Sequence, residues 1–253
     1  MGNYPSHNEE YEETIMSNEQ TKIPVNYPEA AETLKNILHL KGSPVAIRFA
    51  PTKADIPAGM VELDKTIRHC SMVNLARTEG KIFYAPAEKH ECNGGAWSLG
   101  LKEITPTLKN GEFYFKLGKF DSDAACKRTI ERIPHLDTGE TYATLYAPLE
   151  KTPFSPQVIV IVTTPRNMLK LAQSSLFRLG GRIHAEFSGI QSVCADATTQ
   201  TYLSGRPNFS LGCDGSRRFS GIGDDEMVMG FPAEMLPEII AALPIVIGAA
   251  GSK

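Results

Sequence analysis

The chain has 253 residues, of which 42% are hydrophobic and 22% are charged, and its formal net charge is −3. A globular chain of this length can bury roughly 70–75% of its unfolded surface, so it needs no disulfides to hold a core. The small negative charge provides no basic field, and no apolar run is long enough to span a bilayer, so we expect neither a nucleic-acid nor a membrane partner. The opening residues also lack the pattern of a secretory signal peptide, and we therefore expect a cytoplasmic protein.

The chain divides into four segments along its length. The first is polar and acidic, with four glutamates between residues 9 and 13, and it is too poor in apolar residues to fold on its own. The pattern predicts a disordered acidic tail over 1–26, a first α/β repeat over 27–136, a second α/β repeat over 137–245, and a C-terminal tail over 246–253. The two repeats are expected to form one compact domain.

Each predicted repeat opens with a β-rich apolar run bounded by prolines, at 44–51 and at 156–165. A helical segment that contains a cysteine then ends at a glycine. The first such segment runs over 66–80 and contains Cys70, and the second runs over 191–205 and contains Cys194. Glycine at that point is the usual stop signal of a helix.

A short strand follows in each repeat, at 81–85 and at 207–211, and leads to a second cysteine. The turns are Cys92-Asn-Gly and Cys213-Asp-Gly, and both pairs favour a tight turn. Each repeat then closes with a strand and a helix. The predicted strands lie at 112–120 and 226–231, and the helices at 122–133, where Ser122 suits the N-cap, and at 232–243.

The shared order of these elements indicates an internal duplication. We therefore predict an α/β fold, with α+β as the alternative, built from two similar lobes about a pseudo-two-fold axis. The sheets are expected to be mixed rather than purely parallel. Such an axis would bring related loops to face each other.

Four of the five cysteines pair by repeat, and they are Cys70, Cys92, Cys194 and Cys213. Four converging thiolates suit an iron–sulfur cluster or zinc, but the closely spaced pairs of compact zinc sites are absent. Gly94 and Gly215 would leave room and backbone N–H donors for a bulky cofactor. We predict a [4Fe–4S] cluster in electron transfer or a small redox reaction, with zinc as the alternative metal. Helix placement and nearby arginines are expected to favour the thiolate forms, and Cys126 is expected to be structural.

Two other functions stay open, and whether the protein is an enzyme is undecided. Arg206, Arg217 and Arg218 lie in a glycine-rich stretch around Cys213 and could bind a small anionic substrate without any metal. A cysteine nucleophile is the second alternative, because His69 adjoins Cys70 and His90 precedes Cys92. Sequence neighbours on a helix do not face each other, however. The expected partner is a redox protein or a small anion.

Several stretches together resemble the family known as domain of unknown function 169, found in archaea and bacteria that include many anaerobes. The resemblance covers residues 30–243 and implies a compact cytoplasmic protein, but no particular activity. A cluster-bearing protein would fit an anaerobic setting by association. The stretches are His69-Cys70, Glu91-Cys92-Asn-Gly-Gly, Arg132-Ile-Pro-His-Leu136, Val193-Cys194 and Leu211-Gly-Cys213-Asp-Gly-Ser-Arg217.

Overall fold

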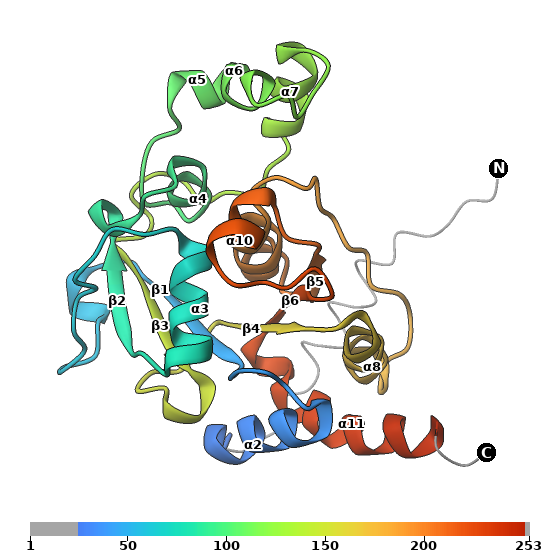
Figure 1. The fold of residues 1–253 in the computed structure, drawn as a ribbon. Helices are drawn as coiled ribbons and strands as arrows, with labels where there is room; N and C mark the ends of the chain where they lie inside the picture. Colours follow the sequence, from blue (N-terminus) through green and yellow to red (C-terminus); the bar gives the residue numbers. More distant parts are fainter. Residues whose placement is uncertain (1–24, 251–253) are drawn as a thin grey trace.

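A computed structural model describes residues 25–250 (Figure 1). The predicted acidic tail over 1–26 lies almost entirely outside the described residues, as do residues 251–253. Within the described range, no helix is both long enough and apolar enough to cross a membrane.

One sheet of six strands forms the centre of the molecule, in the order β2-β3-β1-β4-β6-β5. All neighbouring strands pair antiparallel, so the prediction of mixed sheets is wrong. The run Val-Ile-Val-Ile-Val-Thr forms a central strand because both of its faces are buried. The strands are β1 (Val45–Ala50), β2 (Phe83–Pro86), β3 (Ala143–Pro148), β4 (Val158–Thr163), β5 (Asn208–Ser210) and β6 (Met227–Pro232).

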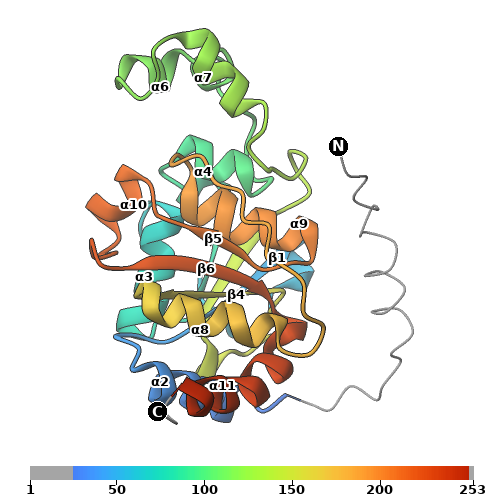
Figure 2. The ribbon, with the colours of Figure 1, turned by 90° about the vertical axis from the view of Figure 1, so that its right-hand side faces the viewer.

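Helices cover both faces of this sheet, as Figure 2 shows. One face carries α2 (Tyr27–Leu38), α8 (Pro165–Leu176) and α11 (Leu236–Ala250). The other face carries α3 (His69–Glu79), α4 (Asn93–Ser98), η4 (Ser192–Thr199), α9 (Gln200–Ser204) and α10 (Asp214–Phe219). Single turns connect these elements at η1 (Lys53–Asp55), η2 (Ala87–Lys89), η3 (Leu149–Lys151) and η5 (Ala233–Met235).

Alternate side chains of the strands fill two apolar cores, one on each face of the sheet. On β1, Val45, Ile47 and Phe49 pack with α3 and η4, whereas Ala46 and Ala50 face α2, α8 and α11. This follows from the two-residue side-chain period of a strand. α11 continues to Ala250, so residues 246–250 are helical although the sequence indicated a tail there.

A small helical arm projects from the body and consists of α5 (Pro106–Lys109), α6 (Glu112–Lys116) and α7 (Asp123–Ile130) (Figures 1 and 2). The strand predicted at 112–120 is therefore wrong. Its apolar alternation is not used for sheet burial, because the side chains of Phe113 and Phe115 are 48% and 43% exposed. The strand β3, which the sequence did not predict, lies beyond the predicted repeat boundary at residue 136.

Several local signals act as predicted. The hydroxyl of Ser122 accepts a hydrogen bond from the Ala125 N–H group and so caps α7. Gly80 ends α3 with φ of 65°, and Gly205 ends α9 with φ of 61°. Both glycines adopt the left-handed conformation that terminates a helix and that other residues rarely adopt.

Candidate functional site

The helices on one face of the sheet place the four repeat-paired cysteines. Cys70 lies in the first turn of α3, and Cys194 is buried in η4, a π-helical segment. Cys92 is the N-cap of α4, and Cys213 is the N-cap of α10. The two predicted Cys-Asx-Gly turns thus each begin a short helix. π-helical segments are rare and are frequent at functional sites.

The four thiol groups lie near one another, although they come from distant parts of the chain. A Cβ atom added at Gly95, in α4, would lie 3.4 Å from the Cys194 sulfur. Burial, followed by the neighbouring Cys92, Cys213 and Cys70, holds the pKa of Cys194 well above its usual value. Each of the other three cysteines therefore lies close enough to influence the ionisation of Cys194.

Burial also keeps two further thiols protonated in the metal-free protein. Burial and then Cys213 raise the pKa of Cys70 to about 11, against an opposing hydrogen bond with Ser220. Burial raises the pKa of Cys92 as well, although the Gly95 N–H group opposes this. The prediction that helix placement would favour thiolates is therefore wrong for Cys70, Cys92 and Cys194, because loss of solvation outweighs the backbone donors.

A backbone N–H group points at the sulfur of the N-cap residue Cys213. The Ser216 N–H group donates to the Cys213 sulfur at 3.4 Å, and the Ser216 hydroxyl accepts from the Cys213 N–H group at 2.9 Å. Gly94 is buried in α4, and Gly215 lies in α10, where an added Cβ would be 3.8 Å from the Cys213 sulfur. Both predicted glycines therefore adjoin the cysteine site.

Two residues that the sequence did not single out also lie at this site. Burial, followed by Cys92, Cys194 and Cys213, raises the pKa of Tyr114, which places this side chain of α6 beside the thiols. Gln191 is 2% exposed, and its side-chain amide interacts with the side chain of Tyr114. Its backbone adopts φ of 52°, which is strained for a residue other than glycine. The arm thus contributes to the site, and only the tertiary structure could reveal this.

A buried chain of hydrogen bonds lies behind Cys70 and Cys92. His69 Nδ1 is 2.7 Å from the Tyr146 hydroxyl, which is 2.8 Å from the Thr144 hydroxyl, and this in turn is 3.2 Å from His90 Nε2. The second ring nitrogen of His69 contacts the Thr198 hydroxyl at 3.1 Å. Both nitrogens of His69 are thus engaged with hydroxyl groups, and together with the raised thiol pKa values this weighs against a Cys–His nucleophile.

The predicted arginine cluster lies in and beside α10. Arg217 donates to the backbone carbonyls of Gly223 at 2.7 Å and Glu226 at 3.1 Å, and also to that of Leu211. Its guanidinium group therefore holds its own loop together rather than facing an open site. The guanidinium of Arg218 lies over the Phe219 ring, 5.2 Å from its centroid, and Arg206 lies two residues before the start of β5.

Cys126 lies apart from these cysteines. It is fully buried in a small core of the arm with Leu108, Ile130 and Ile133. Within the part of the chain that the structure describes, no group of three or more His, Cys, Asp or Glu side chains is arranged to hold a metal ion.

The fold and the site together define a protein of mixed α and β structure, with one antiparallel sheet and a cysteine-rich helical face. The chain belongs to the DUF169 family, described as uncharacterised ArCR, whose model matches residues 33–242. It is 44% identical over 216 residues to an uncharacterised protein of Methanocaldococcus jannaschii. The match covers 85% of this chain and 92% of that protein. No solved structure matches the chain.

Proposed function

We propose that Cys70, Cys92, Cys194 and Cys213 hold an iron–sulfur cluster of the [4Fe–4S] type. The observation that carries this proposal is the proximity of four thiols that come from four separate elements. Cys92, Cys213 and Cys70 lie close enough to Cys194 to raise its pKa. Thiolate sulfur is the ligand that such clusters require. The cluster would supply one-electron chemistry, and the protein would serve in electron transfer or in a small redox reaction.

The sequence spacing of the ligands favours a cluster over a zinc ion, because the closely spaced cysteine pairs of compact zinc sites are absent. Four sulfurs around one zinc, at about 2.3 Å from it, must crowd together, whereas the irons of a cluster each take a separate sulfur and tolerate a wider set.

The surroundings of the thiols fit a bound inorganic group. The N–H group of Ser216 points at the Cys213 sulfur, and such donors tune the potential of a cluster. The buried amide of Gln191 packs against Gly94, where an added Cβ would lie 2.7 Å from its Nε2 atom, and it interacts with the Tyr114 side chain beside the thiols.

An internal duplication would support the same pairing of ligands. The strand order β2-β3-β1-β4-β6-β5 reads alike from either edge if β1, β2 and β3 correspond to β4, β5 and β6. Each half then contributes one cysteine from a helix, α3 or η4, and one from the N-cap of a short helix, α4 or α10. We infer two related halves joined within one sheet between β1 and β4, and a cytoplasmic location, where thiols stay reduced.

Elemental analysis of the full chain purified without oxygen tests the proposal. We expect a brown protein with about four irons and four acid-labile sulfides per chain. Serine in place of Cys70, Cys92, Cys194 or Cys213 should lower the iron content, whereas Cys126→Ser should not. An iron-free wild-type protein, or iron that survives all four replacements, would contradict the cluster. Stoichiometric zinc would replace it with a structural metal.

A further inference from the structure

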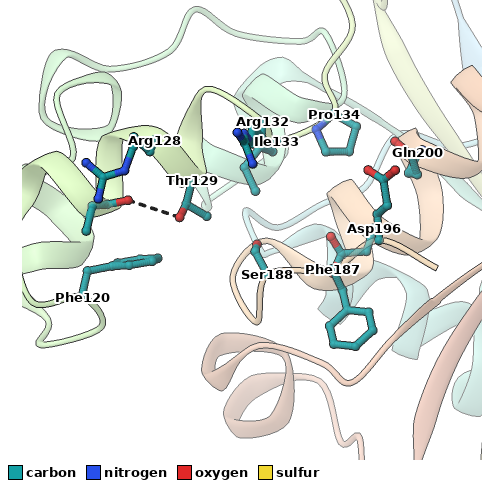
Figure 3. A pocket seen from close by; sticks show the side chains of 12 residues that line it. Phe120, Arg128, Thr129, Arg132, Ile133, Pro134, Phe187, Ser188, Asp196 and Gln200 are labelled. Atoms are coloured by element: carbon teal, nitrogen blue, oxygen red, sulfur yellow. Dashed lines mark hydrogen bonds between the residues drawn. The ribbon is translucent and has the colours of Figure 1, made fainter. Parts of the chain in front are cut away.

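A second site is built between the arm and the body. Here α7 and the turn after it face the segment 186–188 and η4 across a cavity of about 550 Å³ (Figure 3). This volume is typical of pockets for small organic ligands. The four cysteines do not line the cavity, although Asp196, which lines it, lies two residues after Cys194 in η4 and influences the ionisation of that thiol.

The arm supplies the positive wall of this cavity. Arg128 and Arg132 both line it, Arg128 from α7 and Arg132 from the turn that follows the end of α7 at Ile130. Neither guanidinium forms an ion pair within residues 25–250, whereas the neighbouring Lys127 pairs with Glu131 at 3.8 Å. Two unpaired guanidinium groups at one cavity are suited to bind a carboxylate or a phosphate.

The body supplies a different wall. Asp196 lines the cavity from η4, and its Oδ2 atom accepts a hydrogen bond from the Ser210 hydroxyl at 2.9 Å. Glu186 also lines the cavity. Its backbone N–H group donates to the Asn208 side-chain oxygen, and its carbonyl accepts from the Asn208 amide nitrogen, both at 2.9 Å. These carboxyl groups can accept hydrogen bonds from a ligand. Within residues 25–250, neither of them forms an ion pair with Arg128 or Arg132.

Apolar side chains from both the arm and the body complete the lining of the cavity. Phe120 and Ile133 come from the arm, and Phe187, which is 50% exposed, comes from the body. Figure 3 shows Arg128, Thr129 and Arg132 on the side of α7, with Phe187, Ser188 and Asp196 across the cavity. A flat or apolar molecular body would be buried against these rings.

We propose that this cavity binds a small organic anion, with its carboxylate or phosphate on Arg128 and Arg132 and its apolar body between Phe120 and Phe187. A hydroxyl or amino group at the far end of the ligand would donate to Asp196 or Glu186. The inference goes beyond the cysteine site, because none of its contacts involves a cysteine.

Binding of defined probes to the full-length protein tests this site. Isothermal titration would use 4-hydroxybenzoate and phenyl phosphate, which separate the carboxylate from the phosphate class, with 4-hydroxybenzamide as the uncharged control. We expect saturable binding of at least one anion and none of the amide. Arg128→Gln and Arg132→Gln should each weaken binding about tenfold or more, the effect of losing one charge-assisted contact. Lys127→Gln removes the same charge from the same helix and should leave the affinity unchanged.

Two results would overturn the proposal. One is the absence of saturable binding of both anions to a wild-type protein that unfolds cooperatively. The other is binding that both arginine variants retain in full. Cys213→Ser separates the two sites, because it should lose iron and keep the affinity for the anion. Loss of both in that variant would argue against an independent anion site.

Discussion

Gly95 and Cys194 approach so closely that a Cβ atom at Gly95 would lie 3.4 Å from the cysteine sulfur. That distance is an ordinary van der Waals contact, and Gly95 belongs to a helix, α4, in which alanine is accommodated. The backbone of α4 therefore does not require glycine at this position. The absence of a side chain at Gly95 leaves space beside the Cys194 sulfur, where a bound inorganic group would lie.

Gly95→Ala is predicted to separate folding from metal binding. The metal-free variant should unfold within about 1 kcal/mol of the wild type, because the added methyl fits, while its iron content falls. Urea unfolding and iron analysis measure the two effects. Gly248→Ala is the matched control, since nothing lies within 4 Å of its added Cβ. Unchanged iron in Gly95→Ala would show that no cofactor occupies this space.

Cys70 is predicted to be slow to alkylate in the reduced, metal-free protein. Its pKa of about 11 leaves the thiol protonated at neutral pH, and only the thiolate is nucleophilic. The rate should rise with each pH unit until the pH approaches 11, if the protein stays folded. Mass spectrometry after iodoacetamide treatment measures the rate at Cys70, with the unfolded chain as reference. A folded-state rate at pH 8 equal to that of the unfolded chain would contradict the burial of this thiol.

The stability of the metal-free protein should fall in mild acid because of His69 and His90. Burial is the main reason that the pKa of each histidine is lowered to about 3 from an ordinary value of 6.5. Between these values the unfolded chain binds protons that the folded protein excludes. Each histidine therefore removes about 1.4 kcal/mol of stability per pH unit as the pH falls below about 6. Above about pH 6.5 this loss is absent.

Chemical unfolding at several pH values tests the contribution of one histidine. His90→Gln should reduce the dependence of the unfolding free energy on pH between about 6 and 4. His184→Gln, at an exposed position, should leave the slope as in the wild type. An identical slope in His90→Gln and the wild type would mean that His90 is already solvated when the protein is folded.

The buried pair Arg77 and Glu226 is predicted to be essential for stability. Their side chains are 4% and 3% exposed and meet at 2.7 Å, and Glu226 also accepts from the Gly223 N–H group at 2.8 Å. Arg77→Met leaves the buried Glu226 carboxylate with only the exposed Lys41 as a cation, 3.6 Å away, so we expect a cost near the lower end of the about 3–5 kcal/mol typical of a broken buried pair. Urea unfolding measures this loss. The double variant with Glu226→Gln should recover part of it.

A surface pair provides the comparison for this prediction. Lys116→Met removes the partner of Glu112 on the exposed arm and should change the unfolding free energy by about 0.5 kcal/mol or less. If Arg77→Met lowered the unfolding free energy by no more than Lys116→Met does, the pair of Arg77 and Glu226 would not be buried in solution.

Sequence patterns anticipated five of the six strands, because an apolar run bounded by prolines or glycines reports local backbone preference. They failed at 112–120, where alternating aromatics resemble a strand but belong to α6, with Phe113 and Phe115 exposed. β3 was missed because the repeat boundary was placed before it. Its position between β2 and β1 depends on strand pairing across long loops, and the local propensity of the residues does not report such pairing.

The amino-acid order alone determined the cysteine-bearing helices, their glycine stops and the turns at Cys92 and Cys213, since each depends on a few adjacent residues. Only the tertiary structure decided that the four thiols share one face, that Tyr114 and Gln191 join them, and that Arg128 and Arg132 line a cavity. These relations arise when distant segments pack on one sheet, and burial there reversed the expected ionisation of three of the thiols.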